Sequence, residues 1–393
     1  MSASTEKKLR QAAREAGTDK KAIAAAEEAE KKAKSKKKWT WTMIGVVVFI
    51  ALVLILNSTA LYTKTVAATV GGESISPARM NYSYATQYLN FTQSYGSYAS
   101  LFGLDTSAGI NGLKGQACPM DDSVADWKEY FMNSAVSALQ QNIALKKYAE
   151  ENGIELSEED LAALEENYAS IEEAAASYGY ANGDKLIAAN YGRGNDLSTA
   201  RQYDLISALA SKVYSQRSEE IDAEVTDAEV AEAYPTVAVR HILVKAVAEE
   251  DGTYTDEAKE AAKAKAEEIY EQWKSGDADE DSFAALAEEF SEDEGSNTNG
   301  GLYNSVMEGQ TVTEFNDFCF DESRKPGDTG IVYGESGAYA GYHVMYFVGE
   351  GDPADNATGR SYVVSERLNA WVEELAETQE VTDGPFKFLV GKF

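Results

Sequence analysis

Two histidines, His241 and His343, are the only imidazoles in the chain, and each lies in a short apolar stretch. His241 is the third residue of VRHILVK, and His343 is the second residue of YHVMYF. Imidazole can donate and accept hydrogen bonds, and its charge changes near neutral pH. A single histidine in a strand is most often a core residue with satisfied hydrogen bonds. Two histidines that both occupy apolar strands favour a shared site.

Both stretches have the period of a β-strand, in which successive side chains point to opposite faces. His241, Leu243 and Lys245 therefore share one face of the first strand, and His343 shares a face with Met345 in the last strand. If the two strands pair near the centre of a sheet, the two imidazoles can meet on one face.

The residues that surround the two histidines predict a compact α+β unit over 236–350. At Pro235 the helical periodicity gives way to a strand pattern. The expected order is strand, helix, helix, strand, helix, strand, strand (βααβαββ), with Asp281 or Ser282 capping the second helix. The expected elements are residues 237–245, 256–276, 282–290, 301–306, 313–321, 325–333 and 342–349.

Residues 65–235 are mostly helical by their apolar periodicity and contain no histidine. A short strand-like run over 65–70 precedes a turn at Gly71 and Gly72, and a long Gly-, Ser- and Tyr-rich stretch occupies 91–122. Three positions have the residue type and context of a helix N-cap; they are Ser76, Ser157 and Thr226.

Residues 39–62 contain no charged side chain, and about twenty such residues span the hydrocarbon core of a bilayer. Trp39 and Trp41 at one end and Tyr62 at the other have the placement of interfacial aromatics. The lysine cluster before Trp39 should stay in the cytoplasm, which puts the bulk of the chain outside it. A cleaved signal peptide is the competing interpretation, but the preceding 38 residues are long for one.

The charge of the chain is strongly acidic and unevenly distributed. Residues 1–38 carry 12 Lys or Arg and 6 Asp or Glu, so the remaining residues, with 23 and 60, have a formal net charge of −37. Such a surface repels nucleic acid, whose binding needs Lys and Arg to neutralise phosphates. The two cysteines, Cys118 and Cys319, have no zinc-site spacing, and we expect free thiols rather than one disulfide.

These patterns divide the chain into five parts. They are a charged cytoplasmic tail (1–38), a transmembrane anchor (39–62), a helical domain (65–235), the α+β unit (236–350), and a helix with an apolar tail expected to pack on the helical domain (351–393).

Residues 239–349 resemble a parvulin-type peptidyl-prolyl isomerase domain. The resemblance rests on RHILVK at the start, FAALAEEFSEDEGSNTNGGL in the middle, and KPGDTGIV and GYHVMYFV near the end, all in family order. The helical part, with VGGESIS at its start, resembles the chaperone region of SurA/PrsA-type foldases. In those foldases the N-terminal helices pack with the last helix, and the parvulin domain is inserted between them.

The resemblance implies roles for individual residues. The paired histidines of the family fall on His241 and His343, and the acidic or thiol position between them falls on Asp293. The substrate-pocket positions fall on the following residues, with Lys245 at the edge: Leu243, Leu302, Thr311 and Phe315. These residues would form a proline slot above a hydrogen-bonded network. A nucleophilic Asp293 and a metal held by the two histidines and Asp293 are alternatives that the family pattern makes unnecessary.

This chain departs from the family pattern at three points near the proline slot. Thr311 stands where the family usually has methionine, one extra residue lies between Leu302 and Gly309, and Ala340 stands before Gly341 where some relatives have a hydroxyl. The resemblance implies a cofactor-free isomerase and chaperone that assists secreted, unfolded chains with Xaa-Pro bonds outside the cytoplasmic membrane. The alternative is a holdase chaperone whose parvulin domain has lost activity.

Overall fold

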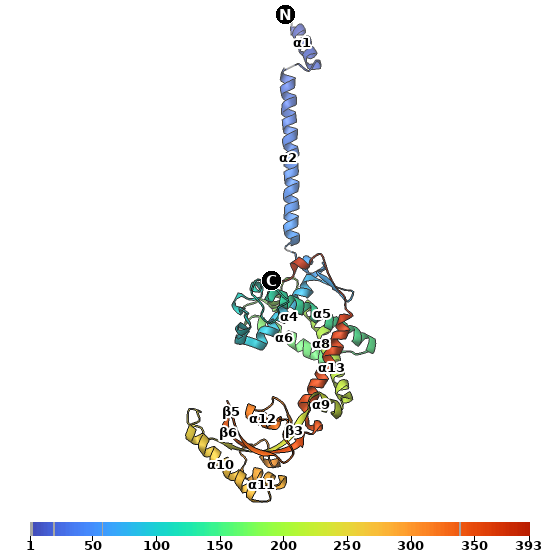
Figure 1. Cartoon of the computed structure of the whole chain (residues 1–393). Coiled ribbons are helices and arrows are strands. Elements are labelled where there is room, and N and C mark those ends of the chain that lie inside the picture. Colours follow the sequence, from blue (N-terminus) through green and yellow to red (C-terminus); the bar gives the residue numbers. More distant parts are fainter. Residues whose placement is uncertain (1–2, 19, 57, 338) are drawn as a thin grey trace. The chain divides into compact units, whose positions relative to one another are not determined.

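The computed structural model describes residues 3–18, 20–56, 58–337 and 339–393, and the fold is α+β (Figure 1). Its contacts divide the chain into two compact units. Unit 1 comprises Met1–Lys146, Glu155–Ala208 and Ala376–Phe393. Unit 2 comprises Lys147–Ile154 and Leu209–Leu375.

Two N-terminal helices, α1 (Ala3–Glu15) and α2 (Lys20–Leu56), precede the small helix α3 (Ala60–Thr63). By length and composition, Glu27–Ile55 could cross a membrane. The expected anchor 39–62 extends too far, because α2 ends at Leu56 and Tyr62 is only 7% exposed. Tyr62 packs with Ala78 and Leu389, so it is a core residue and not an interfacial aromatic.

Unit 1 contains a small antiparallel sheet of order β2-β1-β7. Its strands are β1 (Ala68–Val70), β2 (Glu73–Ile75) and β7 (Val381–Asp383). Gly71 and Gly72 form the turn between β1 and β2, with φ of 56° and 84° that favour glycine. Because β7 comes from the chain's tail and Val390 packs with the core of β1, the tail belongs to unit 1.

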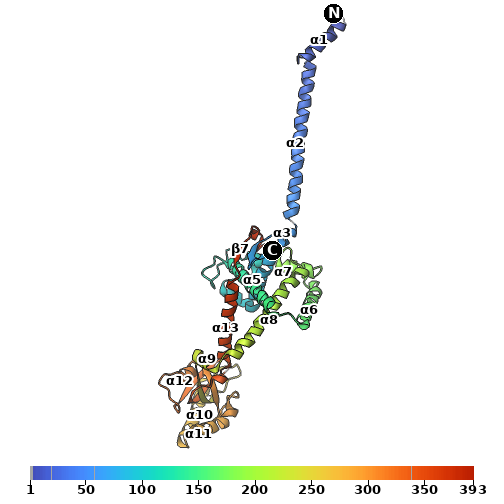
Figure 2. The ribbon, with the colours of Figure 1, turned by 90° about the vertical axis from the view of Figure 1, so that its right-hand side faces the viewer.

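The helices of unit 1 begin where the sequence predicts N-caps. Ser76 accepts a hydrogen bond from Arg79 N, and Ser157 forms a capping box with Asp160. Helices α6 and α7 lie side by side (Figure 2). After α3, the helices wholly in unit 1 are α4 (Pro77–Tyr95), α6 (Glu158–Ala175) and α7 (Gly183–Tyr191), whereas α5 (Trp127–Asn152), α8 (Leu197–Glu224) and α13 (Ala357–Glu377) contribute to both units.

The Gly- and Tyr-rich stretch 91–122 is folded around its own aromatic core. It continues α4 to Tyr95 and then forms three short 3₁₀ segments between residues 96 and 112. Leu104, Leu113 and Trp127 are at most 1% exposed in this core. Cys118 lies in the same core, and Cys319 is buried in unit 2; both are free thiols, as predicted. Burial raises the pKa of Cys319 to about 12.

Unit 2 is built on a four-stranded antiparallel sheet of order β4-β3-β6-β5. The predicted βααβαββ order is confirmed. Its elements are β3 (Thr236–Lys245), α10 (Asp256–Ser275), α11 (Glu280–Phe290), β4 (Leu302–Met307), α12 (Thr313–Cys319), β5 (Thr329–Ser336) and β6 (Tyr339–Glu350). The cap of α11 is Asp279 and not Asp281 or Ser282, since Ser282 is the partner in Asp279's capping box.

The two faces of this sheet carry different helices (Figure 1). Ile242 and Val344 on one face pack against α10 and α11. Val239 and Met345 on the other face pack against α12. The alternation of β3 and β6 therefore sends one set of side chains into an apolar core and the other set, which includes both histidines, toward α12.

Unit 2 also includes residues outside the expected range 236–350. Helix α9 (Asp227–Ala233) begins at the predicted cap Thr226, and Tyr234 at its end bonds Glu366 of α13. Tyr148 packs on Trp371 of α13 with ring centroids 5.0 Å apart. Most of α13 thus lies with unit 2, and its partners Tyr148 and Tyr234 belong to the expected helical domain 65–235, so the helix packs on residues of that domain as the sequence predicts.

Gly301 provides a test of how tightly β3 is held. Its φ is +69°, and a Cβ there would lie 2.2 Å from the backbone oxygen of His241. We expect Gly301→Ala to lower the free energy of unfolding by about 3 kcal/mol or more, because strain and a backbone clash add. Gly309→Ala is the matched control, since Gly309 also has positive φ but no atom within 4 Å of its Cβ position. Chemical denaturation of the full chain in detergent should show the control losing only about 1 kcal/mol; equal losses would contradict the close approach.

Candidate active site

The pairing register of β3 and β6 brings the two histidines together. Leu243 lies opposite His343 and His241 lies opposite Met345, so the imidazoles are diagonal neighbours on one face. Their Nδ1 atoms are 3.0 Å apart and their rings are stacked with centroids 5.2 Å apart. Both side chains are buried, with 3% and 4% of their surface exposed.

Asp293 completes a chain of hydrogen bonds that starts at Tyr339. His241 Nε2 lies 3.0 Å from Asp293 Oδ2, and an ionised carboxylate only accepts, so Nε2 carries the proton. The two Nδ1 atoms face each other, so one must donate a hydrogen bond and the other must accept it; His343 Nδ1 is assigned as the donor to His241 Nδ1. His343 Nε2 then accepts from the Tyr339 hydroxyl at 2.8 Å. These tautomers follow from the hydrogen-bond network.

Asp293 is held in its ionised form by three donors. Besides His241, the hydroxyls of Ser296 and Tyr303 donate to Oδ2 at 2.5 and 2.9 Å. The hydrogen bond from His241, supported by the two hydroxyls, holds the pKa of Asp293 well below its usual range. Burial, and then the bond to Asp293, raises the pKa of Tyr303 to about 12, so this phenol stays protonated.

His343 is neutral over the ordinary pH range. Burial is the main reason that its pKa is lowered from 6.5 to about 3, and the neighbouring His241 lowers it further. The ring is enclosed by Phe315, whose plane stands edge-on with centroids 5.3 Å apart, and by Tyr339. A protonated His343 would therefore be a desolvated charge with no carboxylate in direct contact.

A cavity of about 480 Å³ opens above the two imidazoles. Its apolar walls come from the sheet and from the segment that leads into α12. The residues that line it are His241, Leu243, Asp293, Tyr303, Ser305, Val306, Gln310, Thr311, Val312, Phe315, Tyr339 and His343. An apolar slot over a polar floor can hold a cyclic side chain such as proline while the floor contacts the adjoining peptide bond.

Two of the predicted pocket residues do not line this cavity. Leu302 pairs with Arg240, and directly paired residues share a face, so Leu302 is on the face opposite His241. Val306 and Val312 line the cavity instead and provide apolar wall surface. Lys245 is on the His241 face but exposed at the end of β3, where only its backbone N–H is held, by Glu292.

Two departures from the family pattern, Thr311 and the extra residue before Gly309, fall together at one wall, whereas Ala340 lies in β6 and packs in the core with α10 and α11. Between the pairs Val237–Val306 and Val239–Tyr303, β4 advances three residues while β3 advances two, which is a β-bulge. This bulge lies in the interval where the sequence has an extra residue, and it includes Ser305. The hydroxyls of Ser305 and Thr311 are buried at the cavity, and no described residue forms a hydrogen bond with either.

The sequence prediction missed three members of the network. Tyr339 is four residues before His343 in the same strand, so the period of two placed it on the same face and could have identified it. Ser296 is three residues after Asp293, a spacing at which a hydroxyl can bond a carboxylate within one turn. Nothing in the sequence distinguishes Tyr303, because its contact depends on the bulge in β4.

The three predicted catalytic groups do not converge on one point. The two Nδ1 atoms face each other directly, whereas Asp293 faces the opposite nitrogen of His241. A single ion at normal ligand distances would have to contact one nitrogen of each ring and the carboxylate. The donor arrangement therefore fits a proton-sharing chain better than a metal site.

The lowered pKa of His343 makes stability depend on pH. Between its ordinary 6.5 and about 3, the unfolded chain binds a proton that the folded chain does not, so stability falls as the pH falls. We expect His343→Gln to remove about 2 kcal/mol of the loss between pH 6.5 and 4.5. The measurement is urea unfolding of both chains in detergent at these two pH values. Parallel losses in the two chains would show that His343 is not buried as a neutral base.

Comparisons with known proteins match the same part of the chain. A family model described as the PPIC-type PPIase domain matches residues 224–345. Over 126 residues the chain is 36% identical to foldase protein PrsA 3 of Bacillus cereus, covering 32% of this chain and 36% of that protein. Over 156 residues it is 33% identical to chaperone SurA of Pseudomonas syringae pv. tomato, covering 36% of this chain and 31% of that protein.

The alignments thus span about a third of each curated relative. A crystal structure of the peptidylprolyl isomerase PrsA from Bacillus anthracis aligns with 62% of this chain and 93% of that chain, at 20% identity and a TM-score of 0.23. That score is too low to support a shared overall arrangement. Residues 224–345 nevertheless match in sequence, and we conclude that this part of the chain is a PPIC-type PPIase domain, similar to those parts of foldase protein PrsA 3 and chaperone SurA that align with it.

Proposed function

We propose that this chain is a foldase that is anchored in the cytoplasmic membrane and acts on newly secreted polypeptides outside it. The domain that contains β3 and β6 accelerates cis–trans isomerisation of Xaa-Pro bonds, and the helical unit 1 holds unfolded segments. The observation that most supports the catalytic half is the buried histidine pair, hydrogen-bonded to Asp293, on the floor of an apolar-walled cavity.

The chemistry needs no covalent intermediate and no cofactor. Rotation about a peptide bond has a barrier of about 18–20 kcal/mol because amide resonance is lost in the twisted state. A site that binds the twisted amide more tightly than the planar amide lowers that barrier. Val306, Val312 and Phe315 would hold the proline ring, while the network below would favour the polarised, twisted carbonyl and nitrogen.

His241, Asp293 and His343 act in this proposal as one unit. Each hydrogen bond fixes the tautomer of the next ring, so the floor keeps one arrangement of donors and acceptors. Asp293 serves as the fixed negative end of the chain and not as a nucleophile, because its carboxylate oxygens accept hydrogen bonds from His241, Ser296, Tyr303 and the local backbone.

The apolar part of α2 is the proposed membrane anchor. Glu27–Ile55 is long and apolar enough to span a bilayer, and residues 1–38, with a net charge of +6, precede its apolar centre. Positively charged flanks are retained in the cytoplasm, so the N-terminus is inside and the residues that follow α2 are outside. The named relatives, a foldase and a chaperone, support polypeptides as the substrate class.

The rival function is a holdase whose parvulin domain only binds. The buried hydroxyls of Thr311 and Ser305 favour this rival, because they make one wall of the slot polar. The complete network from Tyr339 to Asp293 favours the enzyme, because an inactive domain would have no need to retain it.

Isomerase activity of the full chain in detergent distinguishes the two. We expect His241→Ala and Asp293→Ala each to lower kcat/KM for Xaa-Pro peptides by about ten- to a hundredfold, because the floor loses its fixed geometry. The measurement is a protease-coupled isomerisation assay, with thermal melting to verify folding. Glu294→Gln is the control, since Glu294 is exposed next to Asp293 but does not line the cavity. An inactive wild type that still suppresses aggregation of an unfolded protein would establish the holdase instead.

Thr311 can be tested separately as the polar wall of the slot. We expect Thr311→Met to raise kcat/KM by roughly fivefold, because more apolar surface would contact the proline ring. Thr313→Met, two residues further on at the exposed start of α12, adds the same side chain outside the cavity and should change nothing. A lower kcat/KM for Thr311→Met would mean that the hydroxyl itself contributes to substrate binding.

A further inference from the structure

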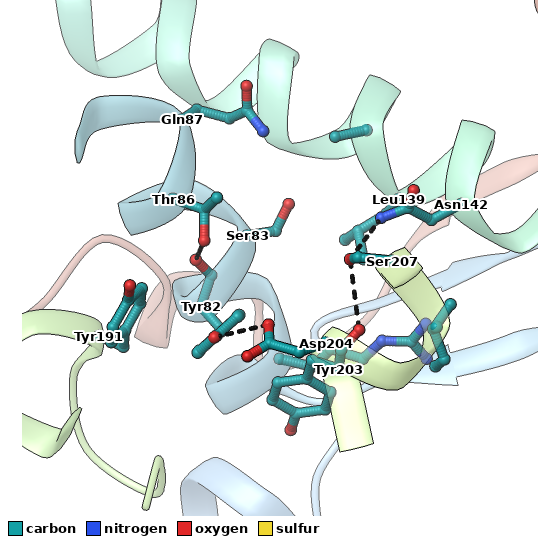
Figure 3. A pocket seen from close by; sticks show the side chains of 13 residues that line it. Tyr82, Ser83, Thr86, Gln87, Leu139, Asn142, Tyr191, Tyr203, Asp204 and Ser207 are labelled. Atoms are coloured by element: carbon teal, nitrogen blue, oxygen red, sulfur yellow. Dashed lines mark hydrogen bonds between the residues drawn. The ribbon is translucent and has the colours of Figure 1, made fainter. Parts of the chain in front are cut away.

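A second cavity, of about 290 Å³, lies within unit 1 between α4, α5, α7 and α8 (Figure 3). Three tyrosines, Tyr82, Tyr191 and Tyr203, line it together with the carboxylate of Asp204. Aromatic rings around a carboxylate are unlike the apolar core that a helical unit requires for stability. The composition of this cavity therefore points to a ligand.

Asp204 is half-buried and accepts hydrogen bonds from neutral groups alone. Its Oδ1 accepts from Tyr82 at 2.8 Å and its Oδ2 accepts from Tyr168 at 2.7 Å. Burial and the nearby Asp204 raise the pKa of both phenols, so they remain donors. Within the part of the chain that the structure describes, no Lys or Arg forms an ion pair with Asp204. Its negative charge is thus solvated by dipoles and has no counter-charge in direct contact.

The rings beside Asp204 are arranged as walls. Tyr82 and Tyr191 stack with centroids 4.3 Å apart, and Tyr82 and Tyr203 are tilted with centroids 5.2 Å apart. Figure 3 shows the Asp204 carboxylate against Tyr82, with the Tyr203 ring beside it. The faces of such rings attract cations, and the attraction increases where water is partly excluded.

The cations that already lie nearby are each bound elsewhere. Arg79 is at the cavity and 5.9 Å from the centroid of Tyr203, but its guanidinium pairs with Glu73 at 3.0 Å. Arg201 lies over the Tyr168 ring at 4.9 Å and pairs with Glu165. These contacts show that the outer rings of the cluster accept guanidinium groups, while Asp204 keeps its carboxylate for another partner.

The opposite side of the cavity is polar and neutral. Asn142 of α5 and Ser207 of α8 bond each other at 3.2 Å, and Gln87 of α4 lies across from them. Amide groups of this kind can bond the backbone of an extended chain that passes the cavity. Backbone contacts at one side and a charged, ring-walled end at the other match a long side chain that enters from a polypeptide.

We propose that this cavity binds the cationic side chain of a lysine or arginine in an extended segment of an unfolded polypeptide. The ammonium or guanidinium group would lie against Tyr82, Tyr191 and Tyr203 and pair with Asp204. The net charge of −37 over residues 39–393 favours the approach of basic segments. This inference rests on the proposed chaperone role of unit 1 and specifies which side chains it selects.

The test compares two fluorescent peptides that lack proline and differ at one position. One carries a single lysine in an otherwise neutral extended sequence, and the other carries norleucine, which has a similar length but no charge. We expect the full chain in non-ionic detergent to bind the lysine peptide about tenfold more tightly. Asp204→Asn, which keeps an acceptor for the tyrosines, should reduce that ratio to near one. Glu219→Gln is the control, because it removes one exposed charge from the same helix, α8, outside the cavity.

Tyr191→Leu serves as the second variant in case Asp204→Asn does not fold. It removes the ring that stacks on Tyr82 and leaves the carboxylate, so it should also lower the lysine preference, by about threefold or more. Equal binding of the two peptides by the wild type, or a ratio that Asp204→Asn leaves unchanged, would overturn the proposal. Isomerase activity measured on the same samples separates the outcomes: active protein without a lysine preference refutes only this cavity's role, whereas loss of activity and of all peptide binding refutes the foldase as well.

Discussion

Two imidazoles in contact inside a sheet cannot both be charged, and much of unit 2 follows from that constraint. His241 and His343 are buried and their Nδ1 atoms are 3.0 Å apart, so one Nδ1 must donate a hydrogen bond and the other must accept it. The surrounding backbone approaches closely to keep them there. A Cβ on Gly334 would lie 2.9 Å from His343 Nε2, and a Cβ on Gly301 would lie 2.2 Å from the His241 carbonyl oxygen. Small residues are required at these points because the rings and their hydrogen bonds occupy the space.

The two units solve the same electrostatic problem in different ways. Asp293 and Asp204 are both partly buried carboxylates that accept hydrogen bonds from neutral donors. Around Asp293 an imidazole supplies one donor, and that imidazole is itself fixed by a second one. Around Asp204 the donors are the phenols of Tyr82 and Tyr168 on separate helices, and Tyr82 and Asp204 both line a cavity. The network around Asp293 fixes which atom donates and which accepts in each hydrogen bond. The site around Asp204 instead leaves a negative charge that an external cation can neutralise.

Local pattern predicted the parts of this site that depend on alternation alone. The period of two placed His241, Leu243 and His343 on one face, and the order of elements in unit 2 was correct. Leu302 was misplaced because its face depends on the pairing register of β4, which a bulge shifts by one residue. The Asp204 cavity left no signal in the sequence, since Tyr82, Tyr191 and Asp204 come from three helices that only tertiary packing brings together. The sequence prediction placed the end of the anchor at Tyr62, whereas α2 ends at Leu56. A run without charged residues shows where charge is absent and not where a helix ends.

The proposed proline slot and its floor are built by different parts of the sheet. We therefore expect the wall of the slot to affect substrate binding and the floor to affect the rate of isomerisation. The floor consists of β3, β6 and the turn at Asp293, and its hydrogen bonds are complete. The wall consists of β4 and the segment before α12, where the bulge brings Ser305 to the cavity and Thr311 faces it. In the proposed isomerase, a polar wall would weaken contact with the proline ring in the planar and the twisted amide alike and so would change KM. The floor would contact the amide that twists and so would change kcat. With Thr311 and the extra residue both at the wall, the proposed enzyme would bind proline segments more weakly while it keeps the groups proposed to accelerate their isomerisation.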